Sequence, residues 1–310
     1  MLIRMALMLG MVSILLAACD RFQLDAQPPT RDIHYADHDE TTLDVYLPET
    51  GNVPYPTVLL VHGRGVSKDY FQGTSTIEDL NQQGYAAVSI NYQFPTATDP
   101  GISLAHVACA LAWVHNQGDA YNLDTENIVV FGHSTGATLA ALLAARDDIS
   151  TFLEDCPGSL PENQLIRGVI GYGGRYGIPS VSFSDPAFLD TFGEHSEVEA
   201  KMIREMFDQL SQIPPSEWVI REELPELVRW YASFFPIAWI DGTEPPFLLV
   251  HGEIDGTVTV NESIAFADVL RQAGVQVELE IIPSDHHRVN QRALHEPLFA
   301  FLSGLAAQQR

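Results

Sequence analysis

Basic residues are scarce in this sequence. Lysine and arginine together number 16, against 41 aspartates and glutamates, so the formal net charge of the 310 residues is -25. Such an acidic protein repels the phosphate backbone of nucleic acids. The composition therefore argues against a nucleic acid partner, although it does not identify a substrate.

The N-terminus has no apolar run long enough to span a membrane. Its apolar run extends only from Met5 to Ala18, after Arg4, which is typical of the core of a signal peptide. The run ends in Leu16-Ala17-Ala18-Cys19, which resembles the lipobox of bacterial lipoproteins. This resemblance implies a signal peptide over 1–18, lipidation of Cys19 and a membrane anchor on the periplasmic face of the bacterial cell envelope. An ordinary secretory signal with a chance cysteine is the alternative.

Cysteine is also rare, with only 3 in the chain. Besides Cys19, the sequence contains Cys109 and Cys156. An exported protein folds in an oxidising compartment, where a disulfide is permitted. The sequence does not show whether the two residues approach each other closely enough. A Cys109–Cys156 disulfide and two buried free thiols therefore both stay open.

Strand-like and helix-like segments alternate along most of the chain. Residues 19–40 lack sustained periodicity and are interpreted as a tether, and residues 41–310 as one domain. We predict strands at 42–47, 57–62, 86–91, 127–131, 167–172, 246–251 and 275–282, and helices at 104–114, 134–146, 261–273 and from about 289. This alternation predicts an α/β fold, with a mostly parallel sheet covered by helices on both faces.

Residues 178–235 interrupt the alternation. The segment is rich in aromatic residues, which is unusual for a plain linker: Phe183, Phe188, Phe192, Trp218, Trp230 and Tyr231. We predict a cap-like insertion over the carboxyl ends of the strands, where open α/β sheets bind ligands.

The segment Gly132-His133-Ser134-Thr135-Gly136 matches the pattern Gly-x-Ser-x-Gly. An apolar strand precedes it and a predicted helix follows it, which is the setting of a nucleophile elbow. The two glycines allow a sharp turn that exposes the Ser134 hydroxyl, and the helix N-terminus directs N–H groups towards developing negative charge. We predict Ser134 as a nucleophile, and the alternative is a capping serine at a glycine-bounded helix start.

A second glycine-rich segment, His62-Gly63-Arg64-Gly65, directly follows an apolar strand. It resembles the His-Gly-Gly-Gly loop of lipases and esterases. The resemblance implies an oxyanion hole formed by the backbone N–H groups of Gly63 and Arg64, together with that of Thr135. Arg64 departs from the usual glycine, and its side chain adds a cation near the pocket. A tight strand-to-helix turn is the alternative.

An acid and a base follow the serine in the chain. Asp255 comes just after a predicted strand, and His286 comes 31 positions later, after the next strand. The chain order Ser134, Asp255, His286 is the order of the α/β-hydrolase triad. We predict that His286 accepts the Ser134 proton and that Asp255 orients the imidazole. The neighbouring His287 is the alternative base.

Together with residues 43–48 and 245–252, these segments resemble the esterase/lipase branch of the α/β-hydrolase superfamily. The resemblance is to hormone-sensitive-lipase-like, feruloyl-esterase-like and kynurenine-formamidase-like carboxylesterases, over roughly residues 41–305. It implies hydrolysis of carboxylic esters through an acyl-enzyme, without a metal or organic cofactor. An arylformamidase or peptidase would use the same triad, and a non-catalytic binding lipoprotein is a third hypothesis.

Overall fold

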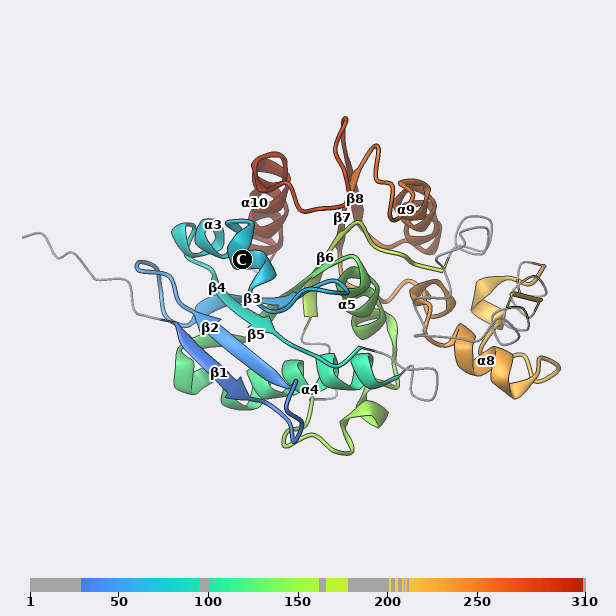
Figure 1. Cartoon of the computed structure of the whole chain (residues 1–310), viewed down its shortest axis with the longest axis horizontal. Helices are drawn as coiled ribbons and strands as arrows, with labels where there is room; N and C mark the ends of the chain where they lie inside the picture. The colour runs from blue at the N-terminus through green and yellow to red at the C-terminus, as the bar shows by residue number, and fades with distance from the viewer. Residues whose placement is uncertain are drawn as a thin grey trace, which may run out of the picture.

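The computed structural model describes residues 29–94, 101–161, 166–177, 201, 204–205, 208, 210 and 212–308. An eight-stranded sheet runs through this part of the chain in the order β1-β2-β4-β3-β5-β6-β7-β8 (Figure 1). The strands are β1 (Thr30–His34), β2 (Thr42–Tyr46), β3 (Tyr55–Val61), β4 (Ala86–Ile90), β5 (Leu123–His133), β6 (Ile166–Tyr172), β7 (Phe247–Gly252) and β8 (Val277–Ile282). The β1–β2 and β2–β4 pairs are antiparallel, and the remaining neighbours pair in parallel. The predicted α/β class with a mostly parallel sheet is confirmed.

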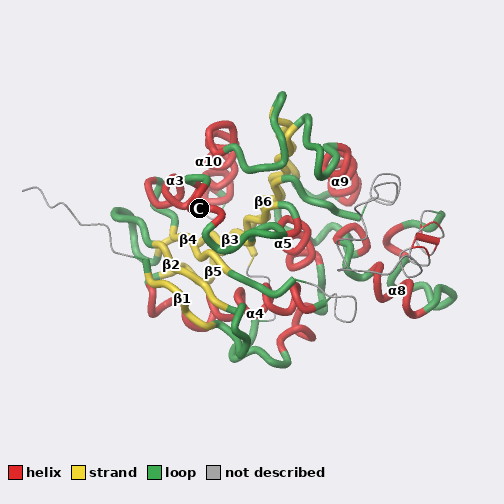
Figure 2. Tube along the Cα trace, in the orientation of Figure 1, coloured by secondary structure: helices red, strands yellow, loops and turns green. Residues whose placement is uncertain are grey.

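Helices cover both faces of the sheet, as Figures 1 and 2 show. The α-helices whose full bounds lie in the described residues are α2 (Tyr70–Gly73), α3 (Thr76–Gln82), α4 (Ile102–Gln117), α5 (Thr135–Ala145), α8 (Glu226–Ala232), α9 (Asn261–Ala273) and α10 (Gln291–Ala307). Side chains of a strand alternate between the two faces. Leu59 and Val61 of β3 accordingly belong to the apolar cluster formed with α4, α5 and α9, whereas Val58 and Leu60 belong to the cluster formed with α2, α3 and α10. No helix in the described ranges combines the length and the apolarity needed to cross a membrane.

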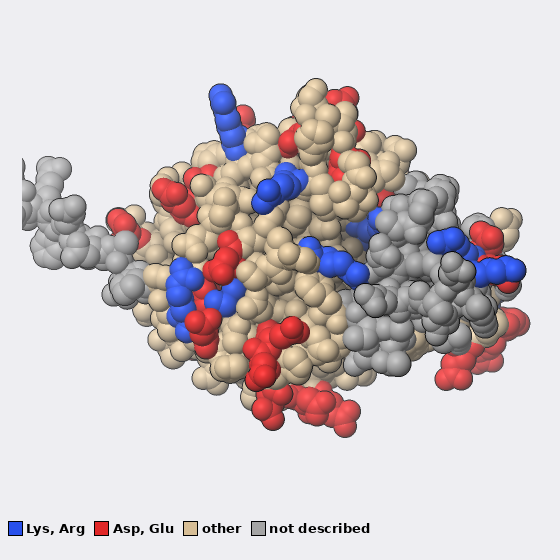
Figure 3. All heavy atoms as spheres, viewed as in Figure 1, with Lys and Arg blue, Asp and Glu red and all other residues tan. Residues whose placement is uncertain are grey.

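The folded domain begins before residue 41, so the predicted tether over 19–40 is too long. Strand β1 pairs with β2, and the carboxylate of the fully buried Asp44 accepts hydrogen bonds from the Asp32 N–H at 2.8 Å and from Arg31 Nη1 at 3.0 Å. Lys68 Nζ lies 2.7 Å from the same carboxylate. Buried charge is tolerated only when it is paired and hydrogen-bonded. Figure 3 shows basic and acidic side chains side by side over this end of the sheet.

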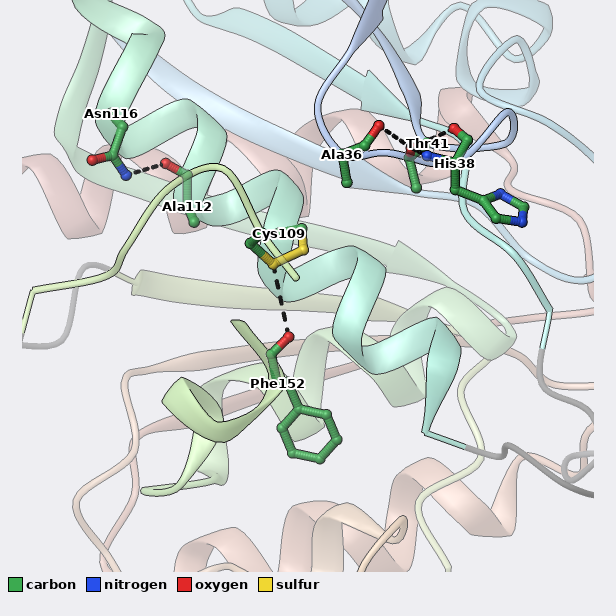
Figure 4. Close-up of a disulfide and its surroundings, with 8 residues drawn as sticks. Ala36, His38, Thr41, Cys109, Ala112, Asn116 and Phe152 are labelled. Atoms are coloured by element: carbon green, nitrogen blue, oxygen red, sulfur yellow. Dashed lines mark hydrogen bonds between the residues drawn. A yellow bond between two sulfur atoms is a disulfide. The ribbon is translucent and has the colours of Figure 1, made fainter. Parts of the chain in front are cut away.

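Cys109 and Cys156 form a disulfide, which decides between the two alternatives that the sequence left open (Figure 4). Their Cα atoms lie 5.4 Å apart, within the usual range for a disulfide. The bond attaches α4 to the segment that follows the 3₁₀ helix η2 (Ile149–Leu153). A second contact in the same region joins Asn116 Nδ2 of α4 to the Ser159 carbonyl at 2.7 Å.

The described end of the 178–235 insertion packs onto the core. Trp218 and Phe235 are buried, and α8 lies beyond α5 and α9 at the edge of the molecule in Figure 1. The Arg146 side chain holds this segment, since Nη1 donates to the Ser233 carbonyl at 2.7 Å and the guanidinium lies 4.1 Å from the centre of the Trp239 ring. Residues 178–200 lie outside the described residues, and the predicted covering of the strand ends stays a prediction.

Candidate active site

Ser134 lies in the sharp turn between β5 and α5. Its backbone has φ 54° and ψ -119°, a conformation that non-glycine residues rarely adopt. The Ser134 N–H donates to the Tyr172 carbonyl of β6 at 2.8 Å, and the Ser134 carbonyl accepts the Ala137 N–H at 2.9 Å. The turn is therefore held by the neighbouring strand on one side and by the first turn of α5 on the other. This local geometry is that of the predicted nucleophile elbow.

Both glycines of the Gly-x-Ser-x-Gly motif are required by close packing. A Cβ atom at Gly132 would collide with the Gly136 carbonyl, and a Cβ atom at Gly136 would collide with the Val61 carbonyl of β3. The strand, the turn and the helix thus approach one another more closely than any other residue permits. The packing of the fold therefore requires the two glycines that the motif contains.

His287, rather than the predicted His286, lies between the serine and the acid. His287 Nε2 is 2.8 Å from Ser134 Oγ, and His287 Nδ1 is 2.6 Å from Asp255 Oδ2. His286 is exposed, and its backbone N–H donates to Asp285 Oδ1 at 2.9 Å. The prediction of His286 as the base is therefore wrong, and its alternative His287 has the required geometry. His287 faces Ser134 because hydrogen bonds fix the conformation of the loop after β8.

Three side chains from neighbouring elements hold this loop. His133 Nε2 is 2.8 Å from the His287 carbonyl, and a carbonyl only accepts, so Nε2 carries a proton and donates. The Tyr70 hydroxyl accepts the Val289 N–H at 3.0 Å. The Tyr172 hydroxyl donates to Asp285 Oδ2 at 3.0 Å. With the backbone held on both sides of residue 287, the His287 ring points at Ser134.

The Asp255 side chain is buried and receives several hydrogen bonds. Its side chain is 0% exposed, its Oδ1 accepts the N–H groups of Thr257 at 2.8 Å and Val258 at 3.0 Å, and its Oδ2 faces His287. Burial by itself raises the pKa of Asp255, but the hydrogen bonds from His251, His287 and the Val258 N–H hold it well below its ordinary value. The carboxylate is therefore ionised, so the facing His287 Nδ1 carries a proton and Nε2 is free to accept the Ser134 hydroxyl proton.

The loop predicted as an oxyanion hole lies against Ser134. A Cβ atom at Gly63 would come within 3.0 Å of the Ser134 Cβ, so only a glycine backbone fits there. His62 Nδ1 lies 2.8 Å from the Gly63 carbonyl and donates to it. Because the peptide group is planar and trans, this bond turns the Arg64 N–H to the opposite side. The ring of His62 stacks on Tyr92 at 4.6 Å, and burial lowers its pKa to about 4.

Several residues that complete this geometry were not predicted from the sequence. Gly173, at the end of β6, has φ +61°, and a Cβ atom there would lie 3.2 Å from His287 Nδ1 and 3.5 Å from Asp255 Oδ2. His133 occupies the x position directly before the serine in the Gly-x-Ser-x-Gly motif. Burial lowers the pKa of His133 to about 4, so its ring stays neutral. His251 contacts the acid from β7. In the sequence, the only sign of these residues was a glycine or a histidine at the end of an apolar strand.

A mostly parallel sheet, a strained serine between β5 and α5, and an acid and a histidine at the ends of later strands define the α/β-hydrolase fold. Within this fold, the BD-FAE family model matches residues 43–270, and the chain belongs to that family.

The chain is also similar in sequence to named esterases and in fold to a solved esterase structure. Esterase LipQ of Mycobacterium tuberculosis is 29% identical over 66% of this chain and 42% of its own length. The probable isoprenylcysteine alpha-carbonyl methylesterase ICMEL1 of Arabidopsis thaliana is 26% identical over 83% of this chain and 50% of its own length. The chain thus spans half or less of the length of these two relatives. A solved structure of a truncated carbohydrate esterase from gut microbiota has a TM-score of 0.66 at 19% identity, and the match covers 92% of this chain and 99% of that one, which shows the shared fold.

Proposed function

We propose that the protein is a serine hydrolase that cleaves carboxylic esters through an acyl-enzyme at Ser134. The observation that carries this proposal is the continuous hydrogen-bonded chain from Ser134 Oγ through the His287 ring to Asp255, with distances of 2.8 and 2.6 Å. Nucleophile, base and orienting acid within such reach are the signature of an activated serine. The esterase names of the two curated relatives support the ester as the substrate class.

In the proposed reaction, His287 Nε2 takes the Ser134 proton while Oγ attacks the ester carbonyl carbon. The resulting oxyanion accepts hydrogen bonds from the backbone N–H groups of Gly63, Arg64 and Thr135. Thr135 is the first residue of α5, where N–H groups have no partner within the helix. His287 then returns the proton to the departing alkoxide, leaving an acyl-enzyme that a water molecule hydrolyses by the same steps. Each oxyanion donor contributes about 10²–10³ to the rate in enzymes of this type.

Labelling with a fluorophosphonate probe tests the nucleophile. The wild-type protein should label and should hydrolyse aryl acetates, and Ser134→Ala should do neither above background. Absence of labelling in the wild type, or equal labelling of Ser134→Ala, would show that Ser134 is not the nucleophile. A protein that fails both assays while folded would favour the binding-lipoprotein hypothesis.

The substrate class requires its own comparison. An ester hydrolase should turn over aryl acetates faster than N-formyl anilides of matched ring substitution. Faster turnover of the anilides would refute the ester assignment and favour an arylformamidase. Because both reactions use Ser134, this result is independent of the labelling experiment.

We also propose that the protein is exported and lipid-anchored at Cys19, on the periplasmic face of the cell envelope. Residues 1–28, including Cys19 and the signal peptide over 1–18, lie outside the described residues, so the support comes from their sequence. The Cys109–Cys156 disulfide supports an oxidising compartment. Acyl chains contribute about 0.8 kcal/mol per buried CH₂ group, so several chains make a lasting anchor. Cys19→Ser should move the protein from the membrane fraction to the soluble fraction, and unchanged fractionation would refute lipidation.

A further inference from the structure

A second histidine contacts the acid of the triad. His251, at the end of β7, is 0% exposed, and its Nε2 lies 3.2 Å from Asp255 Oδ2 and 2.9 Å from the Val258 carbonyl. On its other side, Nδ1 lies 2.7 Å from the Ser263 hydroxyl of α9. The histidine is thus enclosed between the loop that carries Asp255 and the first turn of α9.

The partners of His251 determine where its proton lies. A carbonyl and a carboxylate both only accept hydrogen bonds, so Nε2 carries a proton and donates towards both. The Ser263 hydroxyl is able to donate to a bare Nδ1, which completes the hydrogen bonding of a neutral ring.

Asp255 Oδ2 therefore faces two imidazole N–H groups, one from His287 and one from His251. We propose that His251 is a positioning residue for the triad: its Nε2–H holds Oδ2 of Asp255 in line with His287 and takes up part of the carboxylate charge. This inference rests on the proposed function, since it assigns His251 a role in the same triad.

Loss of the His251 N–H should shift the pH profile of the reaction in one direction. Without the His251 N–H, Asp255 presents more of its negative charge to His287 and stabilises the imidazolium, so the pKa seen in the acid limb of kcat/KM rises. The other titratable groups around His287 are unchanged by such a variant. They are His133 of β5, whose ring lies 5.0 Å from the His287 ring, and Asp285 and Tyr172, which hold the loop.

A matched pair of variants separates hydrogen bonding from packing. His251→Gln keeps a side-chain N–H at a position similar to Nε2, whereas His251→Met has a similar volume and no donor. We expect His251→Met to lower kcat about tenfold with little change in KM, as for loss of a hydrogen bond to a charged group, and to raise the acid-limb pKa by about one unit. His251→Gln should restore most of kcat and the wild-type pH profile. Equal loss in both variants with an unchanged profile would reduce His251 to a packing residue and overturn the proposal.

A spectroscopic measurement on the wild-type protein needs no variant to fold. Nitrogen-15 NMR of the histidine rings should show His251 neutral and protonated at Nε2, and a proton on Nδ1 alone would overturn the proposal. Aryl acetate hydrolysis by the wild type is measured first. Its absence would refute the proposed function, while the NMR result would still test whether His251 Nε2 carries the proton that the proposal requires.

Discussion

Mild acid should destabilise the protein through two buried histidines. Burial lowers the pKa of both His62 and His133 to about 4, whereas in the unfolded chain each titrates near its ordinary value of about 6.5. Below pH ~6.5 the unfolded chain therefore binds more protons than the folded chain. The free energy of unfolding should decrease as the pH falls from there towards 4. Asp255 contributes in a lower range, because the stability from its lowered pKa is complete above about pH 3.8 and is lost progressively as the pH falls further.

The magnitude follows from the two pKa values. Between pH 7 and pH 5, each histidine lowers the free energy of unfolding by about 2 kcal/mol, so the pair contributes ~4 kcal/mol. The structure explains why His133 resists protonation. Its Nε2 proton is used by the His287 carbonyl, and a further proton would enter at Nδ1, which is buried and lacks a hydrogen-bond partner among the described residues. An unpaired buried N–H is costly.

Urea unfolding at pH 7, 6 and 5 measures this effect, with His133→Gln as the matched variant. Glutamine keeps an N–H donor for the His287 carbonyl but does not titrate, so the variant should lose about 2 kcal/mol less than the wild type between pH 7 and pH 5. Other titrating groups act equally on both proteins and cancel in the comparison. Equal losses of free energy in the two proteins over this range would refute the lowered pKa of His133.

Two further predictions concern the packing of the fold. Gly136→Ala should abolish ester hydrolysis and lower the free energy of unfolding by about 3 kcal/mol or more, because the new Cβ collides with the Val61 carbonyl; a variant with wild-type stability and activity would contradict the packing argument. Removing the disulfide with Cys109→Ala and Cys156→Ala should cost about 4 kcal/mol, given the sequence separation of 47 residues. Urea unfolding under non-reducing conditions measures this loss, and unchanged stability would mean that the bond adds nothing to the fold.

Local chemistry explains why much of the fold and the elbow were predictable. The apolar strands and the glycines around Ser134 leave signals within a few residues of each other, and the predicted positions of β4 and α9 agree with the structure to within a residue. Strand β1 was missed because it lies at the edge of the sheet with mostly exposed side chains, so it has no apolar periodicity. Strand β1 is attached to the domain through Asp44, and Asp44 in turn pairs with Lys68, 24 positions away in the chain.

The base of the triad was not predictable because its identity depends on long-range contacts. His286 and His287 are adjacent and chemically identical, and only the conformation of their loop decides which ring faces Ser134. That conformation is held by Tyr70 and His133, which are 219 and 154 residues away from their partners in the chain. The contact of His251 with Asp255 was not predictable either. In the sequence His251 is only the end of an apolar strand, and the folded loop brings the Asp255 side chain next to it.

The assignment of His287 tests the proposed mechanism most directly. We predict that His287→Ala lowers kcat/KM for an aryl acetate by at least about 10³-fold, while His286→Ala, one residue away and exposed, stays within about threefold of the wild type. Circular dichroism and urea unfolding should show both variants folded. A large loss in His286→Ala with near-normal activity in His287→Ala would contradict the Ser134–His287–Asp255 triad.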